Sequence, residues 1–125
     1  MPPSAALLEA LSRLEAARTY MVNLRKNRPD SWKRDYATGR LELQQCIATA
    51  LSLVDGWLRN AGDPATYARF TELAGKAQSG LSMHQARWPV LIIDHDNAEY
   101  NASLAAVNAG FDAVMDFVRT TLKRN

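Results

Sequence analysis

The sequence predicts an all-α fold, an antiparallel up-down-up-down four-helix bundle. Apolar residues recur at three- and four-residue spacing along four stretches of the 125-residue chain. Short breaks marked by proline, glycine and aspartate separate these stretches, which are similar in length. We therefore expect one domain, residues 1–125, with helices at about 4–28, 31–60, 64–88 and 96–123. A three-helix fold, or a dimer of two long hairpins, is the alternative.

The first helix is expected to start at Ser4, a good N-cap residue behind two prolines. It should end just before Pro29, because the residue preceding a proline is disfavoured in helical geometry. Between these limits one apolar stripe runs through Leu7, Leu11, Leu14, Ala17, Met21 and Leu24.

The second helix is expected to continue through Gly39. Its apolar stripe, from Trp32 to Trp57, keeps the same phase on both sides of the glycine. A lone helical glycine costs about 1 kcal/mol relative to alanine, which a long amphipathic helix can absorb. A looser start before Gly39 is the alternative, and Gly62 should end the helix. Cys46 falls within the apolar face and is expected to be a small core residue.

The third helix has the clearest start in the chain. Asp63 followed by Pro64 combines an N-cap acceptor with a proline at the first helical position. Pro89 should end this helix, because proline lacks the N–H that would continue it.

The segment Val90–Ile93 is expected to be an extended or irregular connector that plugs one end of the core. It has strand-like composition, but an isolated strand has no pairing partner. Asp94 or Asp96 should then cap the fourth helix, and Asp96 with Glu99 three residues later suggests a capping box.

Composition and charge favour a cytoplasmic protein. The chain has 15 basic and 13 acidic residues, whereas a dedicated nucleic-acid binder is usually more basic. A single cysteine cannot form an internal disulfide, which suits a reducing compartment. No stretch approaches the roughly 20 apolar residues of a membrane span, and the N-terminus does not resemble a secretory leader. We expect no membrane association.

The predicted topology gathers aromatic and titratable residues at one pole of the bundle. The end of the first helix, the start of the second, the end of the third and the start of the fourth would meet there. We predict an interaction or ligand pole formed by Tyr20, Trp32, Tyr36, His84, Arg87, Trp88, His95 and Glu99. Trp32 and Trp88 are its candidate anchors, because aromatic residues are enriched at interfaces.

Residues 84–90, with the sequence HQARWPV, contain a possible phosphate-acceptor histidine. They resemble the phospho-acceptor box of sensor histidine kinases, in which a helical histidine precedes an acidic residue, an arginine and a proline. His84, Arg87 and Pro89 match this pattern, whereas Gln85 replaces the acid and a tryptophan replaces a small residue. The resemblance covers seven residues and implies phosphotransfer through His84. The alternative is a core-edge histidine whose polar nitrogen is satisfied.

Two further patterns could indicate a binding site. Segment 25–40 holds six cations, two acids, Trp32 and Tyr36, a pattern typical of a single-stranded nucleic-acid surface but also of a solvated helix end. His95 and Glu99 lie four residues apart, but a metal site needs three or four converging ligands. We expect no metal, cofactor or catalytic group.

The sequence therefore favours a protein that is not an enzyme and that binds another protein or itself, as an adaptor, chaperone or regulatory subunit. Self-association would make it a homodimer. Phosphotransfer through His84 is the first alternative, and nucleic-acid binding through segment 25–40 is the second.

Overall fold

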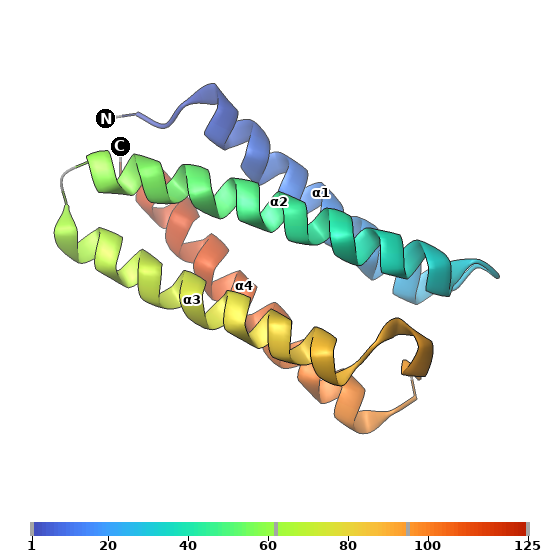
Figure 1. The fold of residues 1–125 in the computed structure, drawn as a ribbon. Coiled ribbons are helices and arrows are strands. Elements are labelled where there is room, and N and C mark those ends of the chain that lie inside the picture. Colours follow the sequence, from blue (N-terminus) through green and yellow to red (C-terminus); the bar gives the residue numbers. More distant parts are fainter. Residues whose placement is uncertain (1, 62, 95, 125) are drawn as a thin grey trace. The chain divides into compact units, whose positions relative to one another are not determined.

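The computed structural model describes residues 2–61, 63–94 and 96–124. These residues form helices α1 (Ala5–Asn27), α2 (Trp32–Asn60), α3 (Pro64–Arg87) and α4 (Ala98–Lys123), with a 3₁₀ turn, η1 (Val90–Ile92), before the last helix (Figure 1). No strand occurs in this part of the chain, so the all-α class is confirmed. None of these helices combines the length and apolarity needed to cross a bilayer.

Two predicted helix caps are confirmed. The Ser4 hydroxyl accepts a hydrogen bond from the N–H of Leu7 at 3.1 Å. The Asp63 carboxylate accepts from the N–H groups of Ala65 and Thr66, at 3.2 and 3.3 Å, and Pro64 starts α3. Short polar side chains at these positions satisfy N–H groups that have no partner inside the helix.

The predicted start of the fourth helix is wrong by two residues. Asn97 is the N-cap, and its side-chain oxygen accepts from the N–H of Tyr100 at 3.1 Å. Asp94 instead accepts from the N–H of Asp96 at 3.0 Å, so these aspartates form a turn before the helix. Aspartate side chains readily bond the backbone two residues on, which competes with capping. The capping box between Asp96 and Glu99 does not form.

The chain forms two compact units. The N-terminal unit, Pro3–Val54, holds α1 and most of α2; the C-terminal unit starts at Asp55 and holds the end of α2, then α3 and α4. Helix α2 passes unbroken through Gly39, as predicted, whereas the predicted stop at Gly62 lies outside the described residues. The single domain and the four-helix up-down arrangement stay predictions.

In the N-terminal unit, α1 and α2 run antiparallel (Figure 1) and approach closely at Gly39. A Cβ atom at Gly39 would lie 2.5 Å from the sulfur of Met21, so glycine allows this approach. Farther along, Arg25 donates a hydrogen bond to the Tyr36 hydroxyl at 3.4 Å. The buried side of α1 holds five residues of the predicted stripe, Leu7, Leu11, Leu14, Met21 and Leu24, joined by Ala10; Ala17 of that stripe is half-buried.

In the C-terminal unit, α3 and α4 also run antiparallel and pack along their length (Figure 1). Ala77 packs against Gly110, whose missing side chain leaves 3.6 Å between an added Cβ and the Cα of Ala77. Where α3 ends and α4 begins, Trp88 packs edge-on against Tyr100, which is fully buried. Aromatic residues therefore close this end of the helix pair.

Candidate functional site

The residues of the predicted pole fall into two sets. Tyr20, Trp32 and Tyr36 belong to the N-terminal unit, and His84, Arg87, Trp88 and Glu99 belong to the C-terminal unit. His95 lies outside the described residues. The single pole that would join the two sets stays a prediction.

In the N-terminal set, Tyr36 is a structural residue. Its ring is buried, lies 6.2 Å from the Trp32 ring in a T-shaped arrangement, and carries the hydroxyl bonded by Arg25. Trp32 is half-buried, with the Lys33 ammonium 5.5 Å from its ring centroid. Tyr20 is half-exposed. Only Trp32 and Tyr20 of this set therefore present an aromatic surface to solvent.

Arg40 is a buried cation, although the sequence indicates it only as one of the six cations of segment 25–40. It is 9% exposed, and its guanidinium lies over the Tyr36 ring, with Cζ 5.3 Å from the centroid. Its Nη2 atom is buried without a hydrogen-bond partner among the described residues. Its burial could have been predicted from its position, because residues four apart lie on the same side of a helix and Arg40 follows Tyr36 of the apolar stripe by four residues. With Tyr36 and Arg40 buried, segment 25–40 has less surface for nucleic acid than its composition suggests.

His84 lies on the seam between α3 and α4. It is 4% exposed, its Nδ1 atom is 2.6 Å from the Ser103 hydroxyl, and Nε2 is shielded from solvent. The ring also lies 5.6 Å from that of Tyr100. This is the environment of a core histidine. A phosphoryl group could reach it only if the two helices separated, so the geometry does not favour phosphotransfer.

Trp88 closes the end of the α3–α4 pair and is not an exposed anchor. It is 5% exposed and packs edge-on against Tyr100 at 5.6 Å. Arg87 lies over its ring, with Cζ 4.6 Å from the centroid, and forms an ion pair with Glu99 at 3.5 Å. Arg87 and Glu99 therefore form an outer polar layer above a buried indole.

The expectation that Val90–Ile93 plugs the core is wrong for its two central residues. Ile93 is buried, but Leu91 is 83% exposed and Ile92 is 55% exposed. The N–H groups of Ile92 and Ile93 bond the carbonyls three residues earlier, at 3.1 and 3.2 Å. In such a turn residues three apart share a side, so Val90 and Ile93 face one way and the residues between them face outward. We call Leu91 and Ile92 the aliphatic tip.

Charged residues adjoin the aliphatic tip in sequence and are mostly acidic. Asp94, Asp96 and Glu99 are all exposed, and Arg87 is the nearest described cation before the tip. Among the described residues that adjoin the tip in sequence, three carboxylates stand against the one cation Arg87, so this stretch carries a negative charge.

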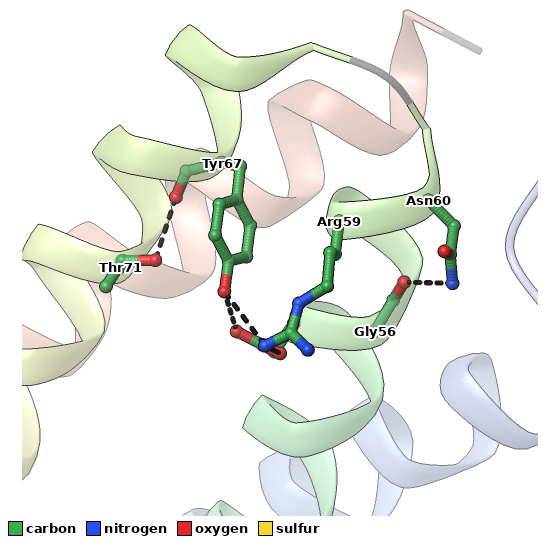
Figure 2. A network of polar contacts seen from close by, with 6 residues as sticks. Gly56, Arg59, Asn60, Tyr67 and Thr71 are labelled. Carbon is green, nitrogen blue, oxygen red and sulfur yellow. Dashed lines mark hydrogen bonds and ion pairs between the residues drawn. The ribbon is translucent and has the colours of Figure 1, made fainter.

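A polar network fastens the end of α2 to the start of α3 (Figure 2). Asp55 accepts hydrogen bonds from Arg59 at 2.9 Å and from the Tyr67 hydroxyl at 2.8 Å. Arg59 also donates to Tyr67 at 3.2 Å, and this bond, together with the charge of Asp55, holds the pKa of Arg59 above its usual value. The network pairs these side chains with one another, which is a structural role.

An open groove of about 690 Å³ lies between α1 and α2 within the N-terminal unit. Small residues Ala16, Ala17 and Gly39 line it beside Tyr20 and Cys46. Cys46 is thus half-buried at a groove, not enclosed in the core as expected. The groove depends on the register of two helices, which periodicity along one helix does not reveal.

Among the described residues, no three histidine, cysteine or acidic side chains gather as metal ligands would. Comparison with protein-family models, with curated proteins and with solved structures finds no match to this chain.

Proposed function

We propose that this chain acts by binding another protein, with the aliphatic tip as the apolar anchor. The supporting observation is the exposure of Leu91 and Ile92, two adjacent large aliphatic side chains. Moving one such side chain from water into an apolar pocket is favourable by about 1.5–3 kcal/mol of free energy. Exposed aliphatic residues are common singly, but a neighbouring pair on a turn is a small docking surface.

The tip is held in place on both sides, which supports the proposal. Trp88 before it and Ile93 after it are buried, and the two 3₁₀ hydrogen bonds fix the backbone between them. An anchor that is already ordered loses little conformational freedom on binding. Such a tip would insert into a preformed pocket.

The charges beside the tip indicate the chemistry of the partner. Asp94, Asp96 and Glu99 favour a pocket with a basic rim, because complementary charge speeds encounter and excludes other partners. The same charges disfavour an anionic lipid surface. An adaptor, a chaperone and a regulatory subunit could all use this surface, and none of these roles requires a catalytic group.

The test is affinity capture combined with site-directed photo-crosslinking. Leu91→Ser with Ile92→Ser should remove the partner that the wild-type chain captures, and a photoreactive residue at position 91 should crosslink to it. Met83→Ser is the matched control, because Met83 is an exposed side chain, at 71%, on α3 of the same unit. Circular dichroism verifies that both variants stay helical.

Two outcomes would contradict the proposal. The first is capture of the same proteins by the tip variant and the wild-type chain. The second is the absence of any specific protein adduct at position 91 while the tip drives binding to phosphatidylcholine vesicles, which would make the tip a lipid anchor.

A further inference from the structure

Arg40 places a charge within the apolar stripe of α2. Tyr36 and Ile47, on the same side of the helix, are buried, and Arg40 itself is 9% exposed. Its Nη2 atom has no hydrogen-bond partner in the described part of the chain. Burying a guanidinium edge without an acceptor costs free energy. Sequences tend to break such local rules at functional sites.

The carboxylates of the N-terminal unit are outnumbered by its cations. The unit has eight basic and five acidic residues, so its net charge is positive. Three of the acids pair with arginines on their own helix: Glu9 with Arg13 at 2.9 Å, Glu15 with Arg18 at 3.8 Å and Asp35 with Arg34 at 3.8 Å. The excess positive charge attracts anions to this unit.

A second guanidinium lies at the same aromatic ring. Arg25 reaches the Tyr36 hydroxyl from α1 at 3.4 Å, and Arg40 lies over the ring face on α2. The ring stabilises one cation through its face and accepts a hydrogen bond from the other. Neither interaction supplies a negative charge. Two cations from two helices thus gather around one buried side chain.

We propose that Arg25 and Arg40 bind a small oxyanion, a phosphate group or a carboxylate, beside Tyr36. The planar fork of arginine bonds either anion through two parallel hydrogen bonds. The anion would accept from the buried edge of Arg40 and neutralise the pair. Arg25 is partly exposed, and because Nη2 of Arg40 is shielded from solvent, a small ion reaches that atom only when the Arg40 side chain shifts toward Arg25. This site shares no residue with the aliphatic tip, so it does not depend on the proposed function.

Titration calorimetry with inorganic phosphate, on protein dialysed into chloride of equal ionic strength, tests the site. We expect one phosphate per chain and a higher melting temperature in phosphate than in chloride. Arg40→Met should weaken binding at least about tenfold, because it removes a charge-assisted fork. Arg25→Met should also weaken binding. Arg13→Met is the matched control: it removes an equal charge from the same unit, at an exposed ion pair, and should leave the affinity unchanged.

A parallel titration with acetate distinguishes the two oxyanions. Binding of acetate, lost in Arg40→Met, would identify a carboxylate site, as for the side chain of a bound protein. Binding of phosphate alone would identify a phosphate site.

The proposal is overturned if neither anion binds the wild-type chain, or if Arg40→Met binds as tightly as the wild type. If Arg40→Met does not fold, Arg40→Lys keeps the charge but removes the fork. Unchanged affinity in both Arg40→Lys and Arg25→Met would then overturn it.

Discussion

At the scale of single residues, short polar side chains next to helix ends were the most predictable part of the chain. Ser4 and Asp63 each precede an apolar stripe, and each caps its helix. Their bonds are local, so neighbouring residues suffice to predict them. Asp96 was predicted wrongly because Asn97 competes for the same role one residue later.

The carboxylate of Asp63 makes part of the stability depend on pH. Hydrogen bonds from the Thr66 side chain, then from the N–H groups of Thr66 and Ala65, lower its pKa below the ordinary value of 3.8. A lowered pKa means that the charged form stabilises the folded state. This contribution is complete above about pH 3.8 and is lost as the pH falls through the folded-state pKa.

Asp63→Ala is therefore expected to be less stable than the wild type at neutral pH, and the difference should shrink below about pH 3.8. Urea unfolding at neutral pH and again below about pH 3.8 measures this difference in the free energy of unfolding. Ser4→Ala is the control, because it removes a non-titrating cap worth about 1 kcal/mol, and its effect should not change with pH. A pH-independent difference for Asp63→Ala would show that the carboxylate charge plays no part.

At the scale of helices, two glycines that both lie inside long helices, Gly39 and Gly75, have different roles. Gly75 in α3 is exposed and has nothing within 4 Å of an added Cβ. At Gly39 an added Cβ would meet the sulfur of Met21 at 2.5 Å. Periodicity correctly predicted that α2 continues through Gly39, but only the packing of α1 explains why a glycine is there.

Gly75→Ala is expected to stabilise the chain by about 0.5–1 kcal/mol, because alanine loses less backbone entropy in a helix. Gly39→Ala has the same helical gain but displaces Met21, so its net effect should be smaller or unfavourable. Chemical denaturation of the two variants compares them. Equal gains would mean that Met21 moves aside at no cost.

At the scale of the whole molecule, one domain remains a prediction that unfolding can test. Helix α2 runs unbroken across the boundary between the two units, and a hairpin of two helices buries too little surface to be very stable alone. We expect both units to unfold in one transition.

Variants that keep a single tryptophan can report on each unit. With the other tryptophans changed to phenylalanine, Trp32 reports on the N-terminal unit and Trp88 on the C-terminal unit. The two fluorescence midpoints should coincide with each other and with the loss of helix measured by circular dichroism. Separate midpoints would mean two independently folding domains.

The all-α class, the helix bounds to within two residues and two of the caps follow from the sequence alone, because they depend on periodicity and on bonds between near neighbours. The tertiary structure decided which side chains are exposed. In the folded chain Trp88 is buried beneath Arg87, and Leu91 is exposed to solvent. Arg40 lies over the ring of Tyr36. Exposure depends on contacts with distant residues and on turn geometry, which composition does not encode, and both proposed binding sites depend on it.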